Sequence, residues 1–284
     1  MFQKLLITMT AAALLTSLTA CGGGSSSSSS STADRSQGAS ESGAITIDGS
    51  TALLPLVKQA AVDYQTAHPN VKISVSGGGS VVGITQAAQK AVDIGDSDIP
   101  APKNPELLDH QVAVVTFAVI ANPAVGVKNL TKAQIGSLFS GTVTNWKQLG
   151  GKDQPITIIN RPRSSGTRAV FVQKLMGGQQ PTASGLTQDS SGTVVTTVAQ
   201  TPGAVSYVAT GYLKKGGIIA LSIDGVAPLE TNVISGKYPF WSYEHMFTLG
   251  SARADVAKFI DYVKTDKSVL NQLGFTAVGE MKAK

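Results

Sequence analysis

The stretch Ala44-Ile45-Thr46-Ile47-Asp48-Gly49-Ser50-Thr51 decides the fold, because a short apolar strand runs there into a glycine and two hydroxyl residues. Apolar residues then recur at helical spacing, which predicts a helix that begins at a Ser50 or Thr51 cap and ends near Pro69. A strand over 71–75 leads into a second glycine-rich turn over 76–80 and a second helix. This alternation predicts an α/β fold with a mostly parallel sheet flanked by helices.

The same alternation continues toward the C-terminus. The near-continuous apolar run over 112–120 is typical of a fully buried parallel strand. The body of roughly 240 residues is long enough for one large domain or for two lobes. Further strands are expected over 155–160, 204–208 and 218–223, and helices over 130–139, from Ser165 onward and within 252–273.

The N-terminal segment has the layout of a secretory signal rather than of a core helix. Lys4 precedes an apolar stretch that ends in small residues before Cys21, which predicts a signal peptide over 1–20. This stretch is shorter than the roughly 20 residues that a spanning helix needs. Leu18-Thr19-Ala20-Cys21 resembles a bacterial lipobox, so we expect lipid modification (palmitate) at Cys21. The expected location is the outer face of the cytoplasmic membrane or the periplasm.

Residues 21–42 are almost entirely Gly, Ser, Ala and scattered charge, a composition that cannot bury enough apolar surface to fold. We therefore expect a lipidated cysteine followed by a disordered tether. A coil of this length reaches roughly 25 Å, which would let the body approach a membrane partner while it remains anchored.

Composition excludes several classes of function. The formal charge is +5 without a basic run, and aromatic residues make up 6%, so nucleic acid is not an expected partner. Cys21 is the only cysteine, and the three histidines, His68, His110 and His245, lack a zinc-ligand spacing, so no metal or other cofactor is expected. Neither a G-x-S-x-G nor a Walker-type motif is present, so an enzyme is not expected.

Three strand-to-helix junctions combine glycine with hydroxyl residues. They lie at Ser50-Thr51, at Ser80 and at Ser165-Gly166-Thr167. A helix N-terminus offers unpaired N–H donors and a partial positive charge, which suits a tetrahedral oxyanion. Any one of these residues could be a plain helix cap. Arg161 lies just before the third junction, and its guanidinium can hold two oxygens of a phosphate at once.

Asp98 is unexpected beside an anion site, because a carboxylate repels an anion. It becomes useful if the ligand carries a proton, as hydrogen phosphate does and sulfate does not near neutrality. A buried charge left without that partner costs at least about 1 to 3 kcal/mol, which is roughly tenfold discrimination or more. The alternative is an aspartate that caps a loop.

These residues together resemble the phosphate-binding proteins of ABC phosphate importers, in the periplasmic-binding-protein superfamily. The resemblance rests on Gly49-Ser50-Thr51, Gly79-Ser80, Asp96-Ser97-Asp98 and Arg161 followed by Ser165-Gly166-Thr167, and it covers nearly all of 44–284. Family members often carry an acid two residues after the arginine, where this chain has Arg163. That side chain either adds attraction for an anion or points outward.

The resemblance implies a two-lobed, type II periplasmic-binding-protein-like fold with the ligand in the cleft between the lobes. Lobe 1 would comprise 43–120 and about 236–284, and lobe 2 about 121–235. The implied phosphate ligands are Ser50, Thr51, the N–H of Ala52, Ser80, Asp98, Arg161, Ser165, Gly166 and Thr167.

The implied function is high-affinity capture of inorganic phosphate by a monomer that delivers it to an ABC permease and ATPase complex. Two alternatives remain open. The scaffold could bind another tetrahedral oxyanion, such as sulfate, molybdate or tungstate, or the protein could be a surface lipoprotein that senses phosphate.

Overall fold

The first three strands and two helices of the computed structural model follow the order expected from the sequence, and the structure describes residues 43–282. The predicted signal peptide, Cys21 and tether lie outside this range. The strands are β1 (Gly43–Gly49), β2 (Val71–Val75), β3 (Ile94–Ser97), β4 (Leu107–Ala121), β5 (Asn129–Leu130), β6 (Thr157–Asn160), β7 (Leu186–Thr187), β8 (Ala204–Ala209), β9 (Ile219–Ile223), β10 (Trp241–Leu249) and β11 (Phe275–Thr276). The helices are α1 (Leu54–Ala67), α2 (Ser80–Ala88), α3 (Lys132–Phe139), α4 (Gly166–Lys174), α5 (Ser191–Gln200), α6 (Glu230–Ile234), α7 (Ala254–Thr265) and α8 (Lys267–Gln272).

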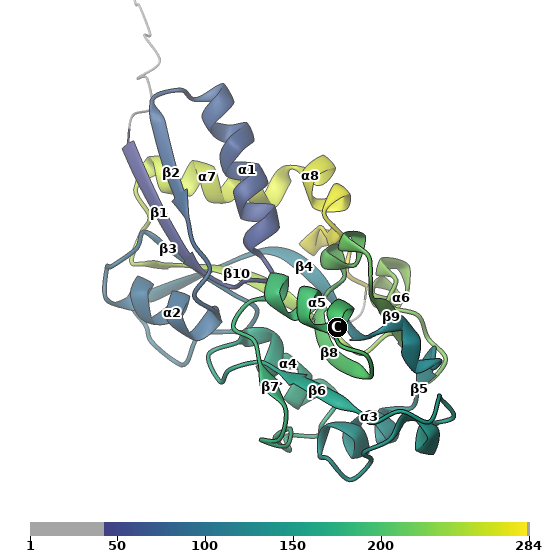
Figure 1. Ribbon diagram of the computed structural model, residues 1–284. Helices are drawn as coiled ribbons and strands as arrows, with labels where there is room; N and C mark the ends of the chain where they lie inside the picture. The colour runs from purple at the N-terminus through teal and green to yellow at the C-terminus, as the bar shows by residue number, and fades with distance from the viewer. Residues whose placement is uncertain (1–42, 283–284) are drawn as a thin grey trace, which may run out of the picture. The chain divides into compact units, whose positions relative to one another are not determined.

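The strands form two groups that share β4 (Figure 1). In the first group, β2, β1 and β3 are parallel, and β10 joins β3 to β4 in antiparallel pairing. In the second group, β8, β6 and β7 are parallel, and β8 and β9 pair antiparallel with the C-terminal part of β4. The predicted α/β class, with parallel strands flanked by helices, is confirmed. The exact lobe boundaries stay a prediction.

The prediction of a parallel strand over 112–120 was wrong. These residues lie in β4, and they are almost completely buried, but their pairing with β8, β9, β10 and β11 is antiparallel. A strand that is covered on both faces is apolar in either direction, so its composition does not reveal its pairing.

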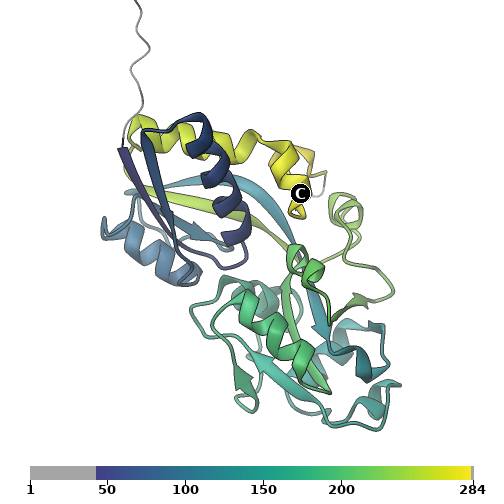
Figure 2. The ribbon, with the colours of Figure 1, turned by 45° about the horizontal axis from the view of Figure 1, so that its top comes forward.

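Helices cover the strands of both groups. In the first group, α1 packs against α7 and α8, which follow one another, whereas α2 packs on β3, β1 and β10 (Figures 1 and 2). In the second group, α4 and α5 pack on β8. The aromatic core beneath them includes Phe171 stacked on Tyr207 with ring centroids 4.1 Å apart.

Two helix starts differ from those expected, and one predicted helical region is divided. The sequence predicts a Ser50 or Thr51 cap for α1, but α1 begins at Leu54 with Leu53 as its N-cap. The helix over 130–139 begins at Lys132, because Leu130 pairs within β5 and Thr131 Oγ1 accepts a hydrogen bond from Gln134 N at 3.1 Å. The region 252–273 contains two helices, with Asp266 as the N-cap of α8.

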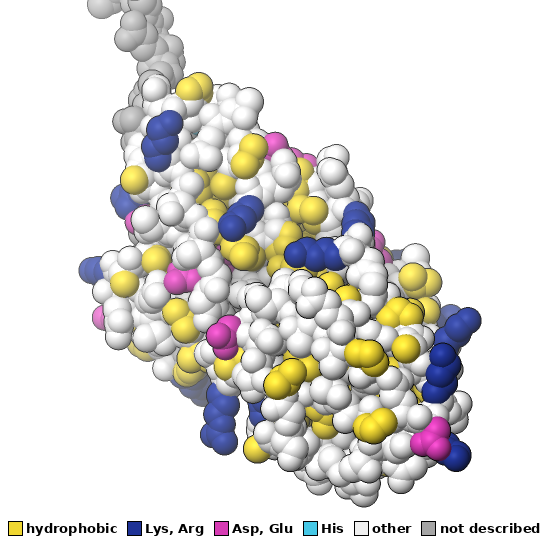
Figure 3. All heavy atoms as spheres, viewed as in Figure 1, with side chains coloured by type: hydrophobic (Ala, Val, Ile, Leu, Met, Phe, Trp, Pro, Cys, Tyr) yellow, Lys and Arg dark blue, Asp and Glu magenta, His cyan; other side chains and the backbone are white. Residues whose placement is uncertain are grey.

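Within residues 43–282, no helix combines the length and apolar character needed to cross a bilayer. The face seen in Figure 3 carries Lys and Arg side chains scattered among uncharged ones. This distribution agrees with the absence of a basic run in the sequence.

Candidate anion-binding site

The first predicted junction follows β1 and is organised by Ser50. Its Oγ accepts hydrogen bonds from Ala52 N at 3.0 Å and Leu53 N at 3.1 Å, so Ser50 caps the turn that leads into α1. The N–H of Ala52 is therefore directed at Ser50. The same hydroxyl donates to Asp98 Oδ1. Thr51 is also buried, with 3% of its surface exposed.

The second junction places Ser80 as the first residue of α2. Gly79 precedes it with φ +99°, a backbone conformation that favours glycine. A Cβ at Gly79 would also lie 3.0 Å from the carbonyl oxygen of Ser164, so glycine allows the close approach of the third junction. Ser80 Oγ accepts from the backbone N of Asp98 at 3.0 Å.

The third junction follows β6 and begins α4 at Gly166. Ser165 is the N-cap, and its Oγ accepts from Arg168 N at 3.2 Å. A Cβ at Gly166 would lie 2.9 Å from Cβ of Asp98, so a larger residue would not fit. Thr167 Oγ1 donates to Asp98 Oδ2 at 2.7 Å. The structure thus brings all three predicted junctions together around Asp98, two of them at its carboxylate and one at its backbone N–H.

Arg161 lies inside this cluster, with 1% of its surface exposed. Its Nη2 donates to Thr51 Oγ1 at 3.0 Å and to the carbonyl of Asp189 at 3.2 Å. Its Nε has no hydrogen-bond partner among the residues that the structure describes. Burial lowers the pKa of Arg161, and nearby Tyr207 and Asp98 act in the opposite direction. Arginine remains a cation under such conditions, so the cluster holds a fixed positive charge with an unused donor.

The ionisation of Asp98 reflects opposing effects. Burial raises its pKa, while hydrogen bonds from Ser50 and Thr167 and the charge of Arg161 lower it. Two further buried acids, Asp96 and Glu244, adjoin it. Within 43–282 none of their four carboxyl oxygens has a hydrogen-bond donor. Burial raises the pKa of both well above the ordinary range, and the nearby carboxylates add to this effect.

Three residues of the cluster were missed by the sequence analysis. Ser191, the first residue of α5, donates its N–H to Thr51 Oγ1 at 3.2 Å, and Arg161 Nη1 donates to Ser191 Oγ at 3.4 Å. Tyr212 OH donates to the carbonyl of Thr51 at 2.6 Å, and Asp189 supplies the carbonyl that Arg161 contacts. The run of Asp189, two serines and a glycine before an apolar helix is a helix-start signal that could have revealed Ser191.

Arg163 points outward and is exposed. It lines a surface pocket with Arg168, whose Nη1 donates to the carbonyl of Arg161 at 2.8 Å. Arg168 thus supports the backbone of Arg161 from the protein surface. Among residues 43–282, no group of three His, Cys, Asp or Glu side chains is arranged to hold a metal ion.

Comparison with known proteins gives consistent matches. The model of the PBP superfamily domain matches residues 33–267. The phosphate-binding protein PstS of Bacillus subtilis is 45% identical over 259 residues, which cover 88% of this chain and 86% of that protein. A putative phosphate ABC transporter substrate-binding protein of Clostridium perfringens, solved with bound phosphate, has a TM-score of 0.78 at 27% identity, covering 83% of this chain and 100% of that one. An ABC-type phosphate transport receptor of Vibrio cholerae has a TM-score of 0.67 at 27% identity and the same coverage.

Proposed function

Because the chain belongs to the PBP superfamily, we propose that it binds inorganic phosphate and delivers it to an ABC-type phosphate import complex. The observation that carries this proposal is the buried Asp98: its carboxylate accepts from Ser50 and Thr167, its N–H donates to Ser80, and the charge of Arg161 acts on it. Such an arrangement suits a tetrahedral anion that also has a proton to donate.

The proposed ligands divide by role. Arg161 supplies the full positive charge. The N–H groups at the helix starts and the hydroxyls of Thr51, Ser80 and Ser165 supply neutral donors, while the hydroxyls of Ser50 and Thr167 hold Asp98. Asp98 accepts the proton of the bound phosphate. Ser191 extends the set, because its N–H and hydroxyl already contact Thr51. The proposed phosphate-binding residues are Ser50, Thr51, Ala52, Ser80, Asp98, Arg161, Ser165, Gly166, Thr167 and Ser191.

Asp98 also gives the proposed site its selectivity. Hydrogen phosphate can donate to the carboxylate, whereas sulfate leaves it unpaired beside an anion. A buried charge without its partner costs about 1 to 3 kcal/mol or more, so phosphate is preferred by roughly tenfold or more.

Capture would couple ligand binding to closure of the two strand groups. Arg161 and Thr167, which follow β6 in the second group, donate to Thr51 and Asp98, which follow β1 and β3 in the first. A phosphate held by both sets of residues binds the closed state more tightly and shifts the population toward it. The closed state is then the form that the importer recognises.

The proposed location is outside the cytoplasmic membrane, with the protein held as a monomer by a lipid on Cys21. This anchor rests on the lipobox-like sequence and on a tether long enough to reach a membrane complex. A Cys21→Ser variant should leave the membrane fraction, and its retention there would contradict the anchor.

A calorimetric titration with phosphate, arsenate and sulfate tests the function. Phosphate and arsenate should bind with similar affinity, because they share shape and protonation, and sulfate should bind at least about tenfold more weakly. Equal affinity for sulfate and phosphate would indicate a general oxyanion receptor instead. Small-angle scattering should show compaction on addition of phosphate, and no change would contradict the closure mechanism.

A further inference from the structure

Strands β3 and β10 run side by side (Figure 1), and Glu244 is the residue of β10 just before the three that pair with β3. The antiparallel register pairs His245 with Ser97 and Met246 with Asp96. Asp98 directly follows β3, and continuing the β3 register by one residue sets Glu244 across from Asp98, at the point where the pairing of β10 with β4 shifts between Glu244 and His245. Cross-strand neighbours of this kind have Cβ atoms about 5 Å apart. Two residues earlier, Ser242 Oγ donates to the carbonyl of Asp98 at 2.6 Å, which fixes β10 against residue 98.

The surroundings of Glu244 offer no compensation for a charge. The residue is 0% exposed, and neither carboxyl oxygen meets a donor within the described part of the chain. β4 places Ala113 opposite it, and α2, which packs on β3 and β10, has no ionisable side chain over Ser80–Ala88. The acids that act on it are Asp96 of β3 and Asp98, the residue directly after β3, with Asp48 of β1 beyond Asp96. Arg161 is the cation of the cluster.

We propose that Glu244 carries a proton and donates it in a hydrogen bond to Asp98, so that it positions Asp98 as an ionised acceptor for the ligand's proton. Three carboxylates, Asp96, Asp98 and Glu244, cannot all be charged in a buried site that also binds an anion beside a single arginine. The proton resides on Glu244 and the charge on Asp98, because Asp98 already accepts from Ser50 and Thr167.

The number of acceptor positions supports this role. A carboxylate offers about four lone-pair sites. On Asp98 the hydroxyls of Ser50 and Thr167 occupy two of them, and a protonated Glu244 occupies a third. One site is left for a ligand, which suits an anion that donates one proton. Glu244 thereby sharpens the preference for hydrogen phosphate over sulfate through Asp98.

The effect of Glu244 ionisation on phosphate affinity has a definite direction. Its pKa is raised well above the ordinary range, chiefly by burial and then by the charges of Asp98 and Asp96, so Glu244 keeps its proton to a higher pH than an ordinary glutamate and loses it as pH rises. Loss of the proton removes a donor to Asp98 and adds a negative charge beside the anion. Phosphate affinity should therefore fall above the pKa of Glu244, by up to about tenfold for each pH unit.

Two substitutions separate this role from a structural one, because glutamine keeps a neutral donor and methionine keeps similar volume without one. We would measure phosphate and sulfate affinity of the full chain between about pH 6 and pH 10. Glu244→Gln should match the wild type within about threefold at the acidic end and should lack the alkaline loss. Glu244→Met should bind phosphate about tenfold more weakly at every pH, with a smaller ratio between phosphate and sulfate affinity.

Phosphate itself ionises in the same way for every variant. Its ionisation therefore does not contribute to the ratio of variant to wild-type affinity at a given pH. Asp109→Asn is the matched control: Asp109 contacts His245, the next residue along β10, and is outside the proposed site. This variant should retain the wild-type profile. Identical pH profiles for the wild type and Glu244→Gln, or equal phosphate affinity for Glu244→Met and Glu244→Gln, would overturn the inference. It rests on the proposed function, but the two fail differently, because a wild-type chain that does not bind phosphate contradicts the function itself.

Discussion

The polar side chains at the carboxyl ends of β1 and β3 differ in burial and hydrogen bonding from those toward the amino ends. At the carboxyl ends, Ser50, Asp96 and Asp98 are buried, and Asp96 lacks any donor among residues 43–282. Away from the carboxyl ends, Thr46 in the middle of β1 and Asp93 just before β3 lie near the surface, and their polar atoms are joined in hydrogen bonds. The same pair of strands thus supports a costly polar cluster at one end and a fully paired one at the other.

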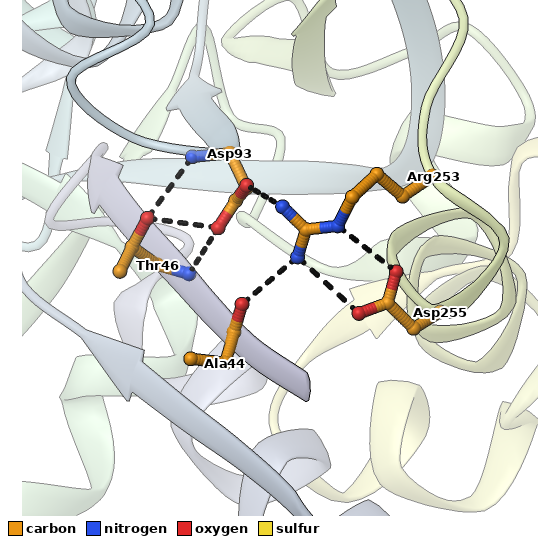
Figure 4. Close-up of polar contacts among 5 residues, drawn as sticks. All are labelled: Ala44, Thr46, Asp93, Arg253 and Asp255. Carbon is orange, nitrogen blue, oxygen red and sulfur yellow. Dashed lines mark hydrogen bonds and ion pairs between the residues drawn. The ribbon is translucent and has the colours of Figure 1, made fainter. Parts of the chain in front are cut away.

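Arg253, which precedes α7, organises the amino-terminal cluster (Figure 4). Its Nη1 donates to Asp93 Oδ1 at 2.6 Å and its Nη2 to the carbonyl of Ala44 at 2.9 Å, while Asp255 accepts from Nε and Nη2. Asp93 Oδ2 in turn accepts from the N and Oγ1 of Thr46. The arginine side chain is 54% exposed, so water can also solvate its charge.

This difference in hydrogen bonding indicates which end of the strands can gain free energy by binding a ligand. Ligands of open parallel sheets bind at the carboxyl ends of the strands, where the chain turns into helices. Unused donors and acceptors there gain a partner only when a ligand arrives. In the other cluster Thr46, Asp93 and Arg253 already have partners, so changes there should affect stability and leave binding unchanged.

The largest effect is expected for Arg161→Ala. The variant loses the buried cation of the site and the donor that has no protein partner, so phosphate affinity should fall by about 3 kcal/mol, roughly a hundredfold, or more. Calorimetric titration measures the affinity, and a thermal scan should show that phosphate no longer raises Tm. Arg161→Lys keeps the charge without the planar guanidinium, so its phosphate affinity should lie between those of the wild type and Arg161→Ala. A loss of less than tenfold in the alanine variant would remove Arg161 from the proposed ligands.

A smaller and more selective effect is expected for Asp98→Asn. The amide cannot accept the ligand's proton as a carboxylate does, and it no longer repels a fully ionised anion. The ratio of phosphate affinity to sulfate affinity should therefore fall about tenfold. Asp93→Asn changes the same chemical group at the other end of β3 and should leave that ratio unaltered. If both variants changed the ratio equally, the contrast between the two ends would not concern ligand recognition.

Much of this site could be predicted from the sequence because its signals are local. Ser50, Ser80 and Thr167 each lie where a strand pattern changes into a helix pattern, and the structure gathers all three around Asp98. Ser50 and Ser80 follow the neighbouring parallel strands β1 and β2, whereas Thr167 follows β6 in the second group, so its place beside them was implied only by the family resemblance.

The parts that the sequence did not reveal depend on long-range pairing. Glu244 reaches Asp98 only because β10 inserts between β3 and β4, and no local pattern specifies that insertion. Ser191 and Tyr212 contact Thr51 from positions 140 and 161 residues further along the chain. The antiparallel pairing of β4 escaped prediction for the same reason, since composition reports burial and not the direction of a neighbour.

The smallest effect is expected at the amino-terminal cluster. Exposed ion pairs contribute about 0.2 to 1 kcal/mol each, so Arg253→Ala, which also removes the donor to Ala44, should lower the free energy of unfolding by about 1 kcal/mol. Denaturant titration measures this loss, which should shrink at high salt because the charges are screened. Phosphate affinity should stay within about twofold of the wild type, since the ion pairs lie at the ends of β1 and β3 opposite to Asp98. A tenfold change in phosphate affinity would show that the two ends are coupled through the strands. Both ends would then contribute to binding, and they would differ only in how much.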